Sequence, residues 1–170
     1  MQDLKKAFII CAVTVLCAIT AVIAEDARYL SSCEVLVIDG DTLILEERTI
    51  RLHGIDAPEI NQYCGSSLGP WSCGAEAKKT LKDIVSSAGA ISCAPAQRKR
   101  YGIYGREMAV CFSASGLDIN RLMVRLGMAR AYEKYSMDYV DDESLAKEAR
   151  RGIWKGTHVS PWRWRRGERR

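Results

Sequence analysis

Four carboxylate residues follow two short runs whose composition is typical of β-strands. Asp39 and Asp41 lie after the first run, in the sequence Asp-Gly-Asp, and Asp56 and Glu59 end the second, in the sequence Asp-Ala-Pro-Glu. Carboxylates this close together repel one another unless a positive charge lies between them. A hard cation that prefers oxygen ligands, such as Ca²⁺ or Mg²⁺, is the simplest such charge. The spacing therefore predicts a metal site built from carboxylates.

Two arginines, Arg51 and Arg106, accompany these carboxylates. Hydrolysis of a phosphodiester gathers negative charge on the phosphate oxygens, and a metal ion together with guanidinium groups can stabilise that charge. Arginine suits this task because its planar fork can hold two oxygens at once. Glu59, just beyond the rigid Pro58, is the candidate base that takes a proton from water or only orients that water. The leading hypothesis is a metal-dependent nuclease.

Each of these motifs alone is more often structural than catalytic. Asp39-Gly-Asp41 is a common β-turn, and Asp56 to Glu59 is a common loop sequence. Only their combination with two arginines favours catalysis. The two histidines fit no metal-binding pattern and the chain has no Cys-x-x-Cys pair, so neither a histidine-based mechanism nor a zinc site is expected. The net charge of +4 is too small to identify a partner.

Hydrophobic periodicity predicts the elements that must position these residues. Strands are expected at 33–38, 42–45, 49–55, 90–94 and 108–113, and helices at 74–87, at 119–126 and from Asp141 or Asp142 to Arg151. Ser72 is a candidate cap for the first helix. If the turn at 46–48 has an odd number of loop residues, Asp41 and Arg51 project from the same face of the hairpin. This order of elements suits a small α+β barrel.

Residues 1–24 are typical of a signal peptide. Lys5 and Lys6 form a positive region, an apolar run follows to Ile23, and Val22-Ile-Ala24 is a small-residue cleavage site. The alternative is an uncleaved membrane anchor, but the apolar run is short for a span. We therefore expect cleavage and a secreted or periplasmic protein, without a stable membrane span once the leader is removed.

Export makes disulfides the expected use of the cysteines. Five of the seven cysteines lie beyond the leader. Cys64 and Cys73 bracket a glycine-rich loop, and Cys93 and Cys111 lie in two of the expected strands. We predict the pairs Cys64–Cys73 and Cys93–Cys111, with Cys33 unpaired. Other pairings stay open, because connectivity does not follow from sequence alone.

Five segments occur together in the order and spacing of a known family. They are Val37 to Thr42, Ile50 to Glu59, Tyr104-Gly-Arg106, Leu126 to Ala129 and Arg151 to Trp154. In these segments the chain resembles the staphylococcal-nuclease-like (thermonuclease) domain, as a secreted bacterial-type member. The resemblance implies such a domain over residues 25–156, with an OB-fold: a five-stranded β-barrel with about three helices. It also implies a calcium-dependent endonuclease that hydrolyses DNA and RNA and leaves 3′-phosphate ends.

The resemblance also implies a metal site and a base. Asp41 and Asp56 match the family's carboxylate ligands of Ca²⁺. Ala57 stands where a backbone carbonyl completes the site, so the loss of a side chain there costs little. Asp39 would support the ligands without binding the metal itself. Glu59 matches the family's proposed general base.

The substrate contacts carry over in the same way. Arg51 and Arg106 match the pair that binds the scissile phosphate. Tyr104 and Tyr132 lie near positions that line the nucleotide pocket, although at Tyr132 the alignment slips by one residue. Many members carry an aspartate two residues before the tyrosine of Tyr-Gly-Arg, where this chain has Gly102. That departure would loosen the loop that holds Arg106.

The C-terminal tail, residues 157–170, is rich in arginine and tryptophan. Trp162 and Trp164 alternate with arginines, so they could stack on bases beside phosphate-binding charges. The equal alternative is that these rings pack back on the barrel. For the whole chain, the alternatives to a monomeric nuclease are a non-catalytic OB-fold module of the cell envelope that binds nucleic acid, and a disulfide-stapled structural protein.

Overall fold

The computed structural model describes residues 35–96 and 105–169. All of them belong to one compact unit, Glu34–Arg170. The proposed leader, Cys33, Gly102 and Tyr104 lie outside the described residues, so the structure does not test what the sequence predicts of them. Within the described ranges, no helix is long and apolar enough to cross a membrane.

Five strands form one mixed sheet in the order β1-β2-β3-β6-β5, in which only β3 and β6 run parallel. The strands of this sheet are β1 (Val35–Val37), β2 (Thr42–Leu45), β3 (Arg48–Leu52), β5 (Ser92–Pro95) and β6 (Glu107–Phe112). A second, two-stranded sheet pairs β4 (Ile55–Asp56) with β7 (Arg130–Ala131). The α+β class and the five-stranded OB-type architecture predicted from the sequence are confirmed, with a barrel-like sheet that is not closed.

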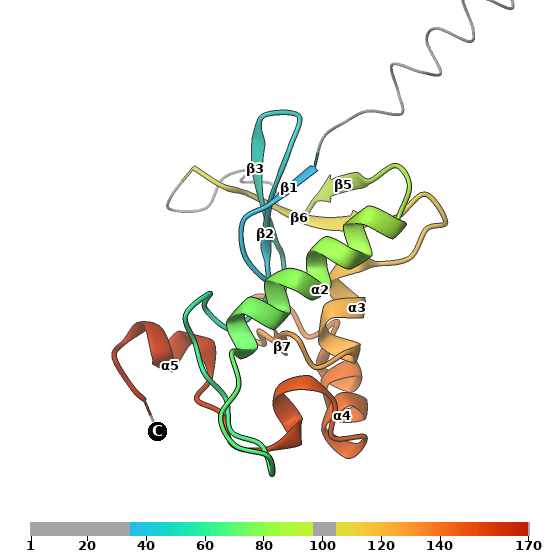
Figure 1. Ribbon diagram of the computed structural model, residues 1–170. Coiled ribbons are helices and arrows are strands. Elements are labelled where there is room, and N and C mark those ends of the chain that lie inside the picture. The colour runs from blue at the N-terminus through green and yellow to red at the C-terminus, as the bar shows by residue number, and fades with distance from the viewer. Residues whose placement is uncertain (1–34, 97–104, 170) are drawn as a thin grey trace, which may run out of the picture. The chain divides into compact units, whose positions relative to one another are not determined.

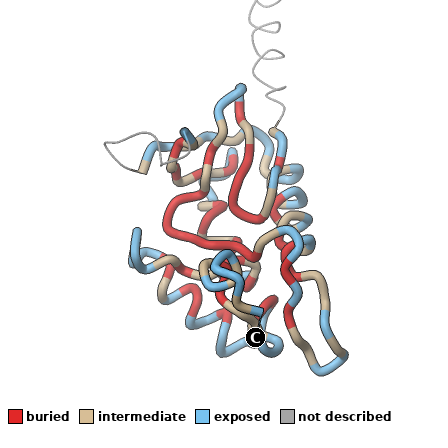
Figure 2. Tube along the Cα trace, turned by 90° about the vertical axis from the view of Figure 1, so that its left-hand side faces the viewer, coloured by how far each residue is buried: buried red, intermediate tan, exposed pale blue. Residues whose placement is uncertain are grey.

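The three expected helices occur in the expected order between and after the strands, and two short helices that were not expected follow them (Figure 1). The helices are α2 (Cys73–Ser87), α3 (Ile119–Arg125), α4 (Val140–Glu148), the 3₁₀ helix η1 (Gly152–Lys155) and α5 (Pro161–Arg165). The core forms where α2 and α3 pack against the sheet: Leu43 and Ile50 from the hairpin meet Leu81 from α2 and Met123 from α3, all fully buried. Figure 2 shows that these buried segments run through the interior, with the outer turns exposed.

The β2–β3 hairpin differs from the prediction. Its loop has two residues, Glu46 and Glu47, and both have positive φ, at 51° and 65°. A two-residue loop of this kind matches the twist of the flanking strands. The register therefore pairs Thr42 with Arg51, and the odd-numbered loop that the sequence suggested is wrong. The expected strand 49–55 also divides, because a turn with Gly54 at φ +75° separates β3 from β4.

The helix ends differ in detail as well. Ser72 lies at the N-cap position of α2 but its side chain makes no capping hydrogen bond. Helix α4 begins at Val140 and ends at Glu148, short of the expected Arg151. Asp142 is not its cap: it is buried and forms ion pairs with Arg121 and Arg125 of α3. Helix α5 lies in the segment that the sequence treated as a tail.

Two disulfides brace this fold, Cys64–Cys73 and Cys93–Cys111. Cys93 and Cys111 are opposite each other in the β5–β6 register, so the second disulfide links neighbouring strands. The first closes the loop ahead of α2, where Cys64 and Trp71 also pair as an isolated β-bridge. These are the two pairs that the sequence suggested.

We expect each disulfide to contribute about 3 kcal/mol to the free energy of unfolding, because each closes a loop of fewer than about twenty residues. Urea denaturation of the double variants Cys64→Ser/Cys73→Ser and Cys93→Ser/Cys111→Ser would measure these losses. Peptide mapping of the non-reduced protein should recover both pairs and leave Cys33 unpaired. A bridge from Cys33 to any of the other four cysteines would contradict the pairing.

Candidate active site

The chain bends sharply between β1 and β2 to present Asp41. The side chain of Asp39 accepts a hydrogen bond from the Asp41 N–H (3.0 Å), which fixes the bend. Gly40 is needed at its centre, because a Cβ there would lie 2.7 Å from the Cβ of Ala57 and 2.8 Å from that of Ala77. Asp39 thus supports Asp41 through its backbone.

Arg51 joins the two proposed ligand carboxylates with one guanidinium group. Its Nη1 donates to Oδ1 of Asp41 (2.7 Å) and its Nη2 donates to Oδ1 of Asp56 (2.9 Å). Asp41 reaches Arg51 although Thr42 is the register partner of Arg51. Asp41 lies in the bend immediately ahead of β2, one residue from that partner, and the long Arg51 side chain reaches its carboxylate.

Burial dominates the electrostatics of these carboxylates. Asp41 is 3% exposed and Asp56 is fully buried. Burial raises the pKa of Asp41 to about 7, although the Arg51 guanidinium acts in the opposite direction. Burial also raises the pKa of Asp56, against the lowering effects of Arg165 and Arg51. Additional positive charge at this site would therefore stabilise both ionised groups.

The loop after Asp56 carries the candidate base and is held from several sides. The Ala57 N–H donates to Oδ2 of Asp41 (2.9 Å). Gln62 is fully buried, and its side-chain Oε1 accepts a hydrogen bond from the Glu59 N–H (3.2 Å). The backbone N–H of Gln62 donates to the Glu59 carbonyl (2.7 Å). The Glu59 side chain remains one-third exposed, at 33%. Sequence reasoning missed Gln62, because a single glutamine in a loop belongs to no pattern.

Helix α2 packs closely against this loop at Gly74. A Cβ at Gly74 would lie 1.7 Å from the carbonyl oxygen of Glu59. The Gly74 N–H also donates to the Gln62 carbonyl (3.2 Å). The start of α2 therefore fixes the backbone that carries Glu59, and it can do so only without a side chain.

Arg165 of α5 completes the cluster; the sequence suggested it as a phosphate-binding charge of the tail and not as a partner of these carboxylates. Its Nη1 donates to Oδ1 of Asp56 (3.0 Å) and to Oε1 of Glu59 (2.7 Å), while its Nη2 donates to Oδ2 of Asp56 (3.0 Å). Arg165 is thus the residue that brings the candidate base and a candidate ligand into one ion-pair cluster. The only sequence signal was the Arg/Trp composition of the tail.

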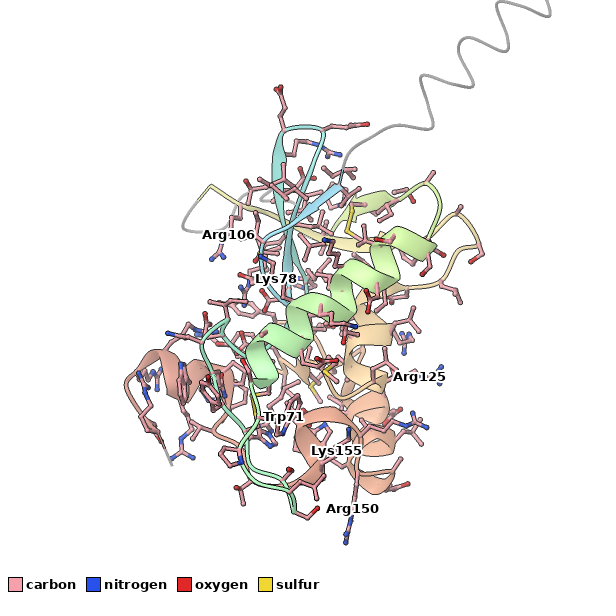
Figure 3. The ribbon with its side chains drawn as sticks, in the orientation of Figure 1. Trp71, Lys78, Arg106, Arg125, Arg150 and Lys155 are labelled. Carbon is pink, nitrogen blue, oxygen red and sulfur yellow. A yellow bond between two sulfur atoms is a disulfide. The ribbon has the colours of Figure 1, made fainter. Side chains whose placement is uncertain are left out.

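Arg106 lies one residue ahead of β6 and is half-buried. Met108, two residues further, is the register partner of Arg51 in the parallel β3–β6 pair. Because alternate residues share a face, this spacing directs Arg106 to the face of the sheet that carries Arg51. Figure 3 shows Arg106 on the same side of the view as Lys78 of α2.

Tyr132 follows β7 and contacts the tail. Its ring stacks on Trp162, with centroids 5.6 Å apart and planes 5° from parallel. The Arg130 guanidinium lies over the same tryptophan, 4.8 Å from the ring centroid. At Trp162, the tail therefore packs back on the domain, which was one of the two alternatives. The Trp164 ring lies under Arg169 at 4.0 Å, within the tail itself.

The donor set suits a hard cation. Within residues 35–96 and 105–169, no group of three or more His, Cys, Asp or Glu side chains forms a ready-made metal cage. Two buried carboxylates nevertheless converge on one guanidinium, so their oxygens face a common region. Calcium accepts irregular shells completed by backbone carbonyls and water, so two carboxylates can hold it. On this donor chemistry Asp41, Asp56 and Ala57 fit Ca²⁺, which stays a prediction.

Comparisons with known proteins identify the family. A family model described as "Staphylococcal nuclease homologue" matches residues 49–156. An "Uncharacterized endonuclease" of Escherichia coli O157:H7 is 35% identical over 138 residues, which cover 77% of this chain and 82% of that protein. One of the same name from Haemophilus influenzae is 33% identical over 165 residues (92% and 85%). The "Micrococcal nuclease" of Shigella flexneri is 30% identical over 152 residues (79% and 80%).

Proposed function

This chain belongs to the staphylococcal nuclease family, and from that membership we propose that it is a secreted, calcium-dependent nuclease that cleaves DNA and RNA and leaves 3′-phosphate ends. Nuclease activity and nucleic-acid substrates come with the family. The metal, the export and the product ends are our proposal. The observation that carries it is the bridge that Arg51 makes between two buried carboxylates, Asp41 and Asp56.

The residues of the site divide the work. Calcium held by Asp41, Asp56 and the Ala57 carbonyl would supply positive charge against the phosphodiester oxygens. The contacts of Arg51 with the two aspartates use two of the five N–H donors of its guanidinium, so others remain for a phosphate oxygen.

The remaining roles follow from position. Arg106, on the face that carries Arg51, supplies a second guanidinium for the phosphate. Glu59 is one-third exposed, so water can reach its carboxylate and be oriented or deprotonated there. Tyr132, and Tyr104 outside the described residues, would contact the nucleotide.

Two features support export. The leader pattern at residues 1–24 is one. The pair of disulfides is the other, because disulfides persist mainly in oxidising compartments. We propose a secreted or periplasmic enzyme that acts as a monomer.

The test is hydrolysis of single-stranded DNA by the full mature protein, in CaCl₂ and in excess EGTA. We expect cleavage in calcium and its loss in chelator, because the proposed ligands are all oxygen atoms. Product ends that a polymerase extends only after phosphatase treatment would establish 3′-phosphates. Full activity in excess chelator would refute the metal assignment. DNA binding without cleavage under any metal condition would favour the non-catalytic module.

A further inference from the structure

The C-terminal segment places a positive charge where the proposed metal would bind. Arg165 contacts both carboxylate oxygens of Asp56 and one of Glu59, at 2.7 to 3.0 Å. Arg51 contacts Oδ1 of Asp56 as well. Both oxygens of this buried ligand are therefore bound to guanidinium groups. Arg51 takes only Oδ1 of each aspartate, whereas Arg165 takes both oxygens of Asp56. A calcium ion therefore competes with Arg165 for Asp56, because two positive charges at so short a distance repel each other.

The segment that carries Arg165 is fastened to the domain ahead of that residue. The Gly65 N–H donates to the Thr157 carbonyl (2.7 Å), and the Gln62 side chain donates to the Val159 carbonyl (2.7 Å). Next along the chain, Pro161 is buried and the Trp162 ring stacks on Tyr132. These contacts hold the start of α5 close to the carboxylates that Arg165 reaches.

Arg165 itself is held by ion pairs and is partly open to solvent. Its side chain is 38% exposed, and its described contacts are ion pairs with Asp56 and Glu59. The residue also lies beyond position 156, where the match to the family model ends.

We propose that Arg165 is a built-in cation that competes with calcium for Asp56 and Glu59, and that segment 157–169 is a latch over the metal site. The proposal rests on the proposed function, since it concerns the same carboxylates. With the latch closed, the site is held in an inactive, charge-balanced state. Calcium must displace Arg165 to bind, and the freed guanidinium then faces solvent or an incoming phosphate.

With competition of this kind, the apparent calcium affinity equals the intrinsic affinity multiplied by the fraction of time that the latch is open. For example, a latch closed for about 90% of the time would weaken calcium binding about tenfold, and removing the Arg165 charge would then tighten it by the same factor. If Arg165 acted only by adding positive charge near the site, the exposed neighbouring Arg166 would lower the calcium affinity in the same way.

The experiment is calorimetric titration of CaCl₂, without nucleic acid, into the full mature chain and three variants. Arg165→Gln removes the competing charge, and Arg166→Gln is the matched control. Trp162→Ala loosens the anchor but leaves both charges. We expect about tenfold tighter binding in Arg165→Gln, a severalfold gain in Trp162→Ala, and wild-type affinity in Arg166→Gln.

Calcium affinity in Arg165→Gln equal to or weaker than in the wild type would overturn the latch, as would an equal gain in both glutamine variants. If EGTA still abolished hydrolysis in that case, the proposed function would stand without the latch. Absence of calcium binding in all four proteins would overturn the calcium assignment, and the latch with it. If Trp162→Ala alone kept the calcium affinity of the wild type, the stacking of Trp162 on Tyr132 would not be what holds the latch closed.

Discussion

Replacing Arg51 with alanine is expected to lower the turnover number on single-stranded DNA by about 100-fold or more, the scale for removing one preorganised donor from a transition state. Two effects combine. The phosphate loses a guanidinium, and Asp41 loses the group that ties it to Asp56. Arg51→Lys should be almost as impaired, because an ammonium group cannot bridge two carboxylates as a planar fork does.

Arg125→Ala is the matched control for this variant. It too removes an arginine paired with a buried carboxylate, but Asp142 keeps Arg121 as a partner. Arg125 lies on the opposite side of the view from Arg106 in Figure 3. The turnover of Arg125→Ala should stay close to that of the wild type.

Arg106→Ala should lose activity on the same scale as Arg51→Ala. Near-normal turnover in both, with calcium binding intact, would leave the phosphate clamp unsupported and favour a binding module.

Gly74→Ala is expected to destabilise the protein by about 3 kcal/mol, at the upper end of the usual cost of overpacking a core. The new Cβ would meet the Glu59 carbonyl oxygen at 1.7 Å and its carbon at 2.5 Å. These are backbone atoms, so the loop and α2 must move apart. The same substitution on an exposed helix would stabilise it by about 1 kcal/mol, so the expected sign is reversed here.

Urea denaturation of Gly74→Ala would measure this loss in the free energy of unfolding. Its turnover number should also fall, because the backbone of Glu59 is displaced. Ala75→Gly is the control. Ala75 is exposed on the same helix, and the reverse change there should cost only the helix propensity of about 1 kcal/mol. If Gly74→Ala unfolded at the wild-type urea concentration or above it, the close contact between α2 and the Glu59 loop would not exist as described.

The sequence predicted the strands well because their side chains alternate between core and surface. In β6 the alternation is complete: Glu107, Ala109 and Cys111 are buried and the residues between them are partly exposed. The turn between β2 and β3 was beyond such reasoning, since glutamates with positive φ are uncommon and carry no composition signal. The contact between Asp41 and Arg51 occurs nonetheless, because the long Arg51 side chain reaches the residue next to its register partner Thr42.

The missed parts of the site depend on residues far apart in the chain. Arg165 meets Asp56 across 109 positions, and Gln62 meets Val159 across 97. Local patterns carry no information about such contacts. The tryptophans of the tail left open whether it packs back on the barrel, but nothing in the tail pointed to Asp56.

The sheet is not closed, so it has two edges with unpaired backbone groups, and such edges invite strands from other molecules. Here both are short: β1 has three residues and β5 has four. Strand β5 also ends in Pro95, which has no N–H to offer, and Cys93 ties it to the neighbouring strand. In the part of the chain that the structure describes, each edge strand thus offers only a short stretch for intermolecular β-pairing. An open barrel can therefore remain free of amyloid-like aggregation without the closure that larger barrels use.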